Sequence, residues 1–266
     1  MKVAIALIAS LCLGTCCSAA VGSQSKIVAK FNPQKLHLVY TPEEGGGTYS
    51  PIDSGRVVIA EGKELLVIDS GIIRKRIKSP GFISTFDISK HGNGIIVSDS
   101  FFYRVKNLQI QNDPIRVLLP GHKKGSFIFK VDIINETTVR IIQNEPQSII
   151  LANIDSLESN RFTVFTDVLS RFTSFSANQY IGQCGQEYFF LEFTAKDGVE
   201  RVFAFKMTNG KPTDERTIAI GDIGRSIPMT CPLRYDADAG FFYTMLVQQG
   251  NFVVRKFNIK DFVAPP

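Results

Sequence analysis

The sequence predicts an all-β protein whose short antiparallel strands form a β-propeller-like fold of five blades. Three observations support this prediction. Runs of β-branched, aromatic and aliphatic residues recur along the chain, separated by short turns rich in Gly, Asn, Asp and Lys. Helical patterns are confined to two short stretches, 154–160 and 166–170. A unit of strand, turn and strand recurs five times, as expected of a repeated sheet.

The expected strands lie mostly in pairs around a polar turn. Residues 56–60 and 64–69 flank the turn Glu61-Gly62-Lys63, and residues 82–88 and 94–99 flank a turn over 89–93. Further strands are expected at 35–40, 127–133, 139–143, 148–154, 187–194, 201–207, 240–248 and 251–258. Many short strands with frequent turns are typical of a sandwich, a barrel or a propeller.

The five units favour the propeller, because a propeller blade is one four-stranded sheet of about 40–50 residues. The units begin near Pro51, Phe82, Phe127, Phe175 and Pro232. Their spacing is uneven, so a six-bladed ring and a β-sandwich are the alternatives. We expect residues 21–266 to form this one domain.

One phrase occurs twice within the units. VIDSGIIR (67–74) and VSDSFFYR (97–104) share the form V-x-D-S-x-x-x-R. An Asp-Ser pair at a strand end can accept backbone N–H groups of the following turn, and the arginine is expected to pair with an aspartate. We interpret the phrase as a structural repeat, not as a catalytic motif.

The stretch PGFISTFDISKHGNGIIVSDSFFYRV (80–105) resembles one repeat of the NHL-type β-propellers. The residues that carry the resemblance are Pro80, Gly81, Asp87, Gly92, Asn93, Asp99, Ser100 and Arg104. Phe101 and Phe102 depart from the pattern, where small polar residues are usual. The resemblance covers one unit clearly and implies a propeller, while leaving function open, because propellers host many activities.

The first twenty residues have the features of a cleavable secretory signal. Lys2 is followed by an apolar run over 3–13, and Ser18-Ala19-Ala20 supplies the small residues of a cleavage site. The apolar run is too short to span a bilayer. We therefore expect residues 1–20 to be removed and the mature protein to be secreted and extracellular, without a membrane span.

Secretion would leave two of the five cysteines, Cys184 and Cys231. In an oxidising compartment we expect these two to form a disulfide, with two buried free thiols as the alternative. The sequence Asn135-Glu136-Thr137 is an N-glycosylation sequon, which predicts a glycan on Asn135 in a surface turn.

Composition and motifs favour binding over catalysis. The formal net charge of +5 is small and spread along the chain, so it does not indicate a nucleic-acid partner. The sequence contains no HExxH, no GxSxG and no phosphate-binding loop. Its three histidines, His37, His91 and His122, are not spaced as a metal-binding pair.

We therefore expect a non-catalytic binding module without a cofactor, which recognises an extracellular protein or glycan through loops at one end of the propeller. The basic runs IIRKRIKS (72–79) and His122-Lys123-Lys124 could attract an acidic partner. Strand alternation would split the first run between two faces, so a solvated edge is the simpler interpretation. Aromatic clusters at 101–103, 188–190 and 241–243 are expected to pack between blades.

A metal-dependent hydrolase or lactonase is the alternative function. It follows from the resemblance, because related gluconolactonase-like propellers hold a calcium-type ion at the central axis. Such an ion polarises an ester or lactone and lowers the pKa of bound water. Side chains at comparable places in the five units are Asp53, Asp87, Asp132, Asn178 and Asp236. The simpler interpretation is that each of them caps a turn of its own blade.

Overall fold

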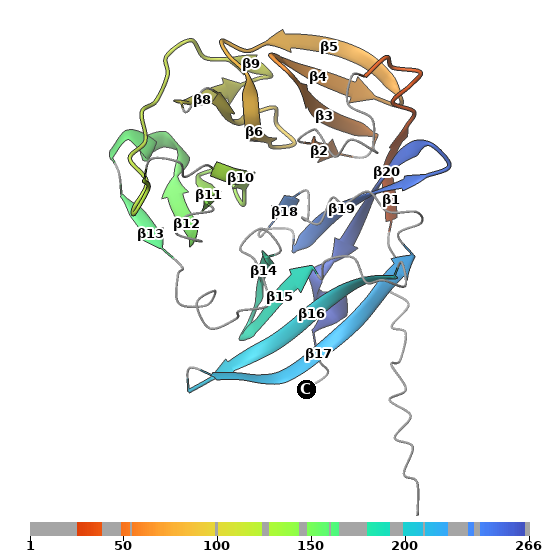
Figure 1. Ribbon diagram of the computed structural model, residues 1–266, viewed down its shortest axis with the longest axis vertical. Helices are drawn as coiled ribbons and strands as arrows, with labels where there is room; N and C mark the ends of the chain where they lie inside the picture. Colours follow the sequence, from red (N-terminus) through yellow and green to blue (C-terminus); the bar gives the residue numbers. More distant parts are fainter. Residues whose placement is uncertain are drawn as a thin grey trace, which may run out of the picture.

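Five four-stranded antiparallel sheets are arranged around a common axis as a five-bladed β-propeller (Figure 1). The computed structural model describes residues 26–38, 49–53, 55–98, 101–123, 128–143, 148–159, 161–164, 180–191, 199–209, 211–222, 234–236 and 240–263. The predicted all-β class and the predicted number of blades are confirmed. The six-bladed ring and the β-sandwich are wrong.

Each blade is a meander of four strands in chain order, except the last. Blade 1 contains β2 (Tyr49–Asp53), β3 (Arg56–Glu61), β4 (Glu64–Asp69) and β5 (Ile72–Lys78); blade 2 contains β6 (Ile83–Ile88), β7 (Gly94–Ser98), β8 (Phe101–Lys106) and β9 (Gln109–Ile110). Blade 3 contains β10 (Ile128–Ile133), β11 (Thr138–Gln143), β12 (Ser148–Asn153) and β13 (Phe162–Val164); blade 4 contains β14 (Tyr180–Cys184), β15 (Glu187–Leu191), β16 (Val199–Thr208) and β17 (Lys211–Asp222). Blade 5 contains β18 (Arg234–Asp236), β19 (Phe241–Gln248), β20 (Asn251–Asn258) and, from the other end of the chain, β1 (Lys26–Phe31).

The predicted units mark the inner strands of the blades. In Figure 1 the inner strands β2, β6, β10, β14 and β18 surround the axis. Every predicted unit start falls within one of these strands or a few residues before it. The unit starts therefore mark the inner strands, although the strand pair predicted in the first unit, 56–60 and 64–69, forms β3 and β4, the two middle strands of blade 1.

In the part of the chain that the structure describes, two short 3-10 helices accompany the strands. η2 (Ile154–Ser159) follows β12, within the predicted helix 154–160, and η4 (Ile259–Phe262) follows β20. The second predicted helix, 166–170, lies outside the described residues. No helix in the described part of the chain has the length and the hydropathy that a membrane span requires.

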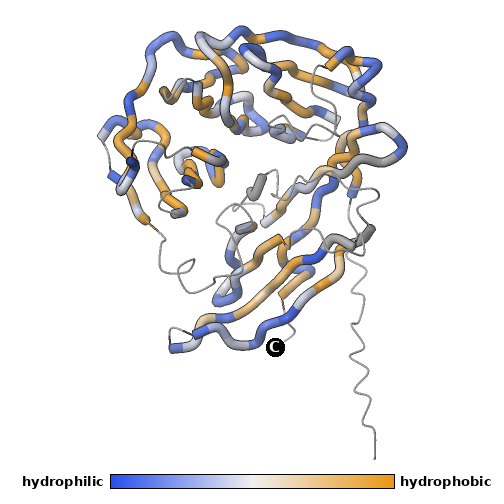
Figure 2. The backbone as a smooth tube through the Cα atoms, in the orientation of Figure 1, coloured by the Kyte–Doolittle hydropathy of each residue, from blue (hydrophilic) through white to orange (hydrophobic). Residues whose placement is uncertain are grey.

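The middle strands of a blade are buried on both faces, because each blade packs against two neighbours. In β3 and β4 the runs VVIA and LLVI are buried without alternation. The outer strand β5 instead exposes most of its residues to solvent. Figure 2 shows this contrast as largely hydrophobic middle strands and a hydrophilic stretch along the outer strand of blade 1.

Five clusters of buried apolar side chains lie one at each contact between neighbouring blades. Blades 2 and 3 share a cluster that contains Phe102, and blades 4 and 5 share one that contains Phe189 and Phe242. Phe190 and Phe205 pack between blades 3 and 4. The predicted packing between blades is thus confirmed for Phe102 and for the aromatic clusters at 188–190 and 241–243, whereas Phe101 is 39% exposed.

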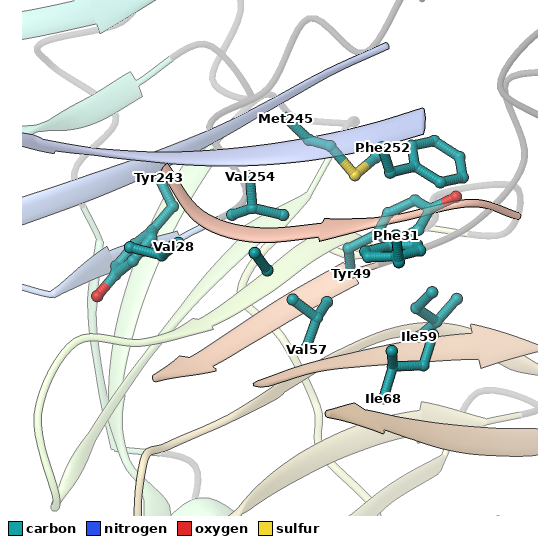
Figure 3. Packing of buried hydrophobic residues seen from close by; sticks show 11 residues of the cluster. Val28, Phe31, Tyr49, Val57, Ile59, Ile68, Tyr243, Met245, Phe252 and Val254 are labelled. Atoms are coloured by element: carbon teal, nitrogen blue, oxygen red, sulfur yellow. The ribbon is translucent and has the colours of Figure 1, made fainter. Parts of the chain in front are cut away.

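The strand β1 closes the ring. It pairs antiparallel with β20 and supplies the outer strand of blade 5, beside blade 1 (Figure 1). Figure 3 shows the closing cluster, in which Phe31 of β1 packs against Phe252 of β20, with 5.2 Å between ring centroids. The backbone N–H of Gly55 donates to the carbonyl of Val28, which joins blade 1 to β1.

The strand predicted for residues 35–40 is wrong over its described part. Residues 33–37 form a turn in which the N–H of Lys35 donates to Oδ1 of Asn32 at 2.9 Å. His37, expected on a sheet face, has a positive φ of 53°. Leu36 and Leu38 of this stretch pack against the closing cluster, whereas Val39 and Tyr40 lie outside the described residues.

The equivalence of the two V-x-D-S-x-x-x-R phrases is also wrong. VIDSGIIR joins β4 to β5, the third and fourth strands of blade 1. VSDSFFYR begins in β7 and ends in β8, the second and third strands of blade 2. The phrases therefore occupy different strand connections, and Asp99 and Ser100 lie outside the described residues.

Candidate functional site

A pocket of about 360 Å³ lies between blades 2 and 3, at the end of the ring where the first strand of each blade turns into the second. Blade 2 contributes the β6–β7 turn and the end of β8, and blade 3 contributes the β10–β11 turn and the start of η2. The lining residues with polar side chains are Ser89, His91, Asn93, Arg104, Lys106, Glu136, Thr137 and Asp155. We refer to this site as the interblade pocket.

The blade 2 wall is held in place by its own turn. The N–H of Ser89 donates to the carbonyl of Asn93 at 2.7 Å, and Gly92 adopts a positive φ of 77° between them. Oδ1 of Asn93 accepts the N–H of Asn107 from the neighbouring β8–β9 turn. The two turns therefore present one connected surface beside the pocket.

The blade 3 wall contains the predicted sequon. Oδ1 of Asn135 accepts the N–H and the hydroxyl of Thr137, at 3.0 Å and 3.2 Å, which closes an Asx turn. The carbonyl of Thr137 then accepts the N–H of Ile154, the first residue of η2. Glu136 is exposed at the tip, and Asn135 is half-buried.

Polar and charged side chains bridge the two walls. Nε2 of His91 on blade 2 lies 3.6 Å from Oε1 of Glu136 on blade 3. The Arg104 guanidinium donates to the carbonyl of Asp155 at 3.0 Å and to the carboxylate of Glu158 at 2.9 Å. A hydrogen bond from its own backbone N–H and the charge of Arg104 hold the pKa of Glu158 below its ordinary value. Arg104 thus pairs with a glutamate of the next blade, and not with an aspartate as predicted.

The arrangement is suited to binding. Blade 2 presents mainly cations and amide groups, whereas blade 3 presents carboxylates and hydroxyl groups. A concave site with a few convergent polar groups orients a ligand by hydrogen bonds and charge. The sequence did not reveal this site, because its residues come from four separate segments. Signals near it were the sequon, His91, and the residues Asn93 and Arg104 of the stretch that resembles an NHL repeat.

The predicted axial carboxylates have structural partners instead. Asp53 forms an ion pair with Arg56 of the same blade, whose pKa is raised by the hydrogen bond. Asp87 is buried, and it accepts the hydroxyl of Ser50 from blade 1 at 2.5 Å and the N–H of Ile133 from blade 3 at 2.6 Å. The expectation that each carboxylate serves only its own blade is therefore wrong for Asp87.

Asp132 is the centre of a buried ionic group. Its carboxylate lies 2.7 Å from Nζ of Lys130 and 2.7 Å from Nη2 of Arg140. Burial raises the pKa of Asp132, but the two cations lower it more strongly, so that it lies below its ordinary value. Arg140 also donates to the carbonyl of Ile181 at 2.9 Å, which joins blade 3 to blade 4.

The remaining predicted residues are only partly described. Asn178 and Cys231 lie outside the described residues, and Asp236 is described in its backbone alone, as the end of β18. Cys184 is half-buried at the end of β14, so the predicted disulfide stays a prediction. Within the described ranges, no three His, Cys, Asp or Glu side chains gather closely enough to hold a metal ion.

The two basic runs lie on different parts of the ring. Arg74, Lys75 and Arg76 are exposed on β5, the outer strand of blade 1, as predicted for a solvated edge. His122 and Lys123 are exposed ahead of β10, whereas Lys124 lies outside the described residues.

No protein-family model matches the chain, and no curated protein matches it either. Among solved structures it is similar to hydrazine synthase of Kuenenia stuttgartiensis, with 12% identity and a TM-score of 0.39 over 68% of this chain and 51% of that chain. It is also similar to PorZ of Porphyromonas gingivalis, an essential bacterial surface component of the type-IX secretion system (13% identity, TM-score 0.38, 76% of this chain and 25% of that chain).

A third similar structure is the β-propeller domain of Cps50 (Swd1) from Myceliophteria thermophila, with 6% identity and a TM-score of 0.39 over 78% of this chain and 82% of that chain. The chain spans about half of the hydrazine synthase chain and a quarter of the PorZ chain. These similarities assign neither a family nor an activity, and the propeller fold rests on the strand pairing of the molecule itself.

Proposed function

We propose that this protein is a secreted, non-catalytic binding module that recognises an extracellular protein or glycan through the loops at one end of its propeller. The interblade pocket is the observation that carries the proposal, because two turns, a strand end and a 3-10 helix direct polar groups of both signs into one hollow. Propeller folds in general are compatible with a binding role, and ligands are bound in such concave polar sites.

The sequence supports the remaining parts of the proposal. Residues 1–20 have the features of a secretory signal. The proposed Cys184–Cys231 disulfide and the proposed glycan on Asn135 are both modifications that secreted proteins acquire. The stretch 80–105 that resembles an NHL repeat covers most of blade 2, the blade that forms one wall of the pocket. We propose that blade 2 is an NHL-type repeat.

Secretion and its two modifications can be tested together. The full chain, expressed in a eukaryotic cell, is expected in the medium with an N-terminus near residue 21. Its glycan is expected to be lost in an Asn135→Gln variant, and its mass to show one disulfide. A protein retained in the cell with residues 1–20 attached would contradict the secretory part of the proposal.

Binding can be tested by site-directed photocrosslinking on the secreted protein. A photoreactive amino acid replaces Lys106 at the pocket, and in a matched variant it replaces Lys211 on the outer strand of blade 4, since both lysines are exposed. Incubation with extracellular material should give crosslinked species from position 106 and not from position 211. Equal crosslinking from both positions, or none from position 106, would contradict binding at this end of the ring.

A further inference from the structure

The outer strand of blade 1 contains a β-bulge within its basic run. The pairing of β4 with β5 shifts between Val67, which faces Lys75, and Ile68, which faces Ile73, so that Arg74 has no cross-strand partner. A bulge interrupts the alternation of side chains and changes the direction in which a side chain points. The run therefore does not divide evenly between two faces, as regular alternation would require.

One hydrogen bond connects this strand to blade 2, and two more connect the turns of blade 2 to each other. Nζ of Lys75 donates to the carbonyl of Leu108 in the β8–β9 turn at 2.8 Å. Two hydrogen bonds then join the β8–β9 turn to the β6–β7 turn. The N–H of Leu108 donates to the carbonyl of Gly92, and the N–H of Asn107 donates to Oδ1 of Asn93. The bulged strand and the two turns thus form one continuous surface that leads to the interblade pocket.

The β8–β9 turn is fixed in a conformation that its residues rarely adopt. Asn107 and Leu108 both have positive φ, 50° and 55°, as in a type I′ hairpin turn. For leucine this conformation is strained, and it persists only where the surroundings hold it. Gly92 provides room, because a Cβ there would lie 3.1 Å from Cγ of Leu108. Lys106, the residue before the turn, is therefore presented by a rigid backbone.

The cations on this surface are exposed, and most are not neutralised. We call the following set the basic band: Arg74, Lys75, Lys90 and Lys106, all of which are exposed. Arg74, Lys90 and Lys106 have no ion-pair partner among the described residues. Farther along β5 the charge is compensated, since Arg76 lies 3.0 Å from Glu64 and Lys78 faces Glu64 across the strands. Excess positive charge is thus concentrated at the pocket end of the strand.

A protein partner would require an apolar centre, which the basic band does not offer. In the described part of the chain, neither turn has a large exposed apolar side chain, and β5 adds only Ile72. Protein interfaces are depleted of lysine at their core and rich in aromatic residues. A row of cations on a fixed backbone instead matches a ligand whose repeating feature is negative charge, and the guanidinium group of Arg74 is well shaped for a sulfate.

We propose that the basic band binds a linear sulfated polysaccharide, laid along blades 1 and 2 toward the interblade pocket. This inference rests on the proposed function, of which it specifies the ligand class. The band supplies charge-assisted contacts to successive sulfate groups, and its rigid turn lowers the entropic cost of binding.

Retention on immobilised heparin tests the proposal with the secreted full-length protein. The double variant Arg74→Glu/Lys106→Glu reverses two charges of the band. The matched control Lys211→Glu/Lys260→Glu reverses two exposed lysines on blade 4 and after β20. Both variants change the net charge equally, so only the position differs. We expect the first variant to bind heparin about tenfold more weakly and the control to differ from the original protein by less than about twofold.

Three outcomes would overturn the proposal: no retention of the original protein, an equal loss in both double variants, or equal retention on poly-glutamate or on anionic lipid vesicles. Melting curves and circular dichroism establish that both variants are folded. The crosslinking experiment separates the two proposals. If position 106 crosslinks to a protein and the protein does not bind heparin, the binding-module proposal stands and the polysaccharide proposal is refuted. If both experiments fail, both proposals are refuted.

Discussion

Asp87 bonds to three blades with one buried carboxylate, which is 1% exposed. It accepts the hydroxyl of Ser50 from blade 1, the N–H of Ile88 in its own strand and the N–H of Ile133 from blade 3. Removing the carboxyl group would leave two buried N–H groups without this acceptor, and an unpaired buried N–H is costly. We expect Asp87→Ala to lower the free energy of unfolding by about 2–4 kcal/mol.

Urea denaturation measures this change, and Asp53→Ala is the matched control. Asp53 forms its ion pair with Arg56 where the two side chains are 40% and 38% exposed, so its loss should cost less than about 1 kcal/mol. Equal losses in the two variants would show that Asp87 does not tie the blades together.

Asp132 makes stability depend on pH. Burial raises its pKa, but Lys130 and Arg140 lower it below the ordinary value of about 3.9. The folded protein then binds this proton less readily than the unfolded chain does. The stabilisation is fully present above about pH 4, and it is lost as the pH falls through the lower pKa of the folded state.

We expect Asp132→Asn to be less stable than the original protein at pH 7, by about 3–5 kcal/mol, because it leaves two buried cations without their counter-charge. Between pH 4 and more acid conditions the difference between the two proteins should shrink. Urea titrations at pH 7, 5, 4 and 3 measure both effects. A difference that is constant over this series would refute the role of the carboxylate charge.

At the scale of the strands, the sequence indicates the middle strands of the blades, and it gives little sign of the strands at the rim or of the inner strands β2, β14 and β18. Middle strands are buried on both faces, so they are apolar runs bounded by turns, and β3, β4 and β7, with the inner strand β6, were predicted almost to the residue. The inner strands β2 (YSPID) and β14 (YIGQC) are short and of mixed polarity, and they were not predicted. Outer strands have one solvated side, and β17 reads KPTDERTIAIGD, which has no strand period at its start. β1 was missed because its partner β20 is at the other end of the chain.

The same limit applies to the site. The carboxylate of Asp87 meets partners 37 and 46 residues away, and Arg104 meets Glu158 at a separation of 54. A sequon or a basic run is visible locally, whereas a pocket made by two blades appears only when the ring places them together. Residue types therefore pointed to polar and charged groups of interest, whereas the sequence around each residue did not reveal its partners in the fold.

Gly94 sets the distance between the first two strands of blade 2. It pairs with Ile88, and an added Cβ would lie 2.2 Å from the carbonyl oxygen of Asp87 and 3.0 Å from Cα of Ile88. Because both obstacles are backbone atoms, β6 and β7 would have to separate beside the pocket. We expect Gly94→Ala to destabilise by about 3 kcal/mol, as overpacked sites do.

The comparison is with Gly62→Ala in the β3–β4 turn. There an added Cβ meets nothing within 4 Å, and only the positive φ of 61° opposes alanine, which costs about 1–2 kcal/mol. Chemical denaturation of both variants decides between a steric and a conformational cause. A Gly94→Ala protein as stable as the Gly62→Ala protein would mean that the strands move apart freely.

At the scale of the whole molecule, the ring holds together only if its two ends meet. Blades 1 to 4 are each continuous in the chain, but blade 5 needs β1 to complete it. Without β1, the backbone edge of β20 and the closing cluster around Phe252 would be open to solvent. An unpaired strand edge over an exposed apolar surface favours aggregation.

A chain that begins at residue 33 should therefore lose cooperative thermal melting, or aggregate, whereas a chain that begins at residue 21 should melt in one transition. A further version of this shortened chain carries residues 26–31 after residue 266, joined by a flexible linker. The appended segment can pair with β20 as β1 does, so it should restore the cooperative transition. Differential scanning calorimetry of the three proteins measures this. A cooperative transition at an unchanged Tm in the shortened chain would mean that the five blades are stable without closure, and the contacts of Phe31 and Val28 would then be dispensable.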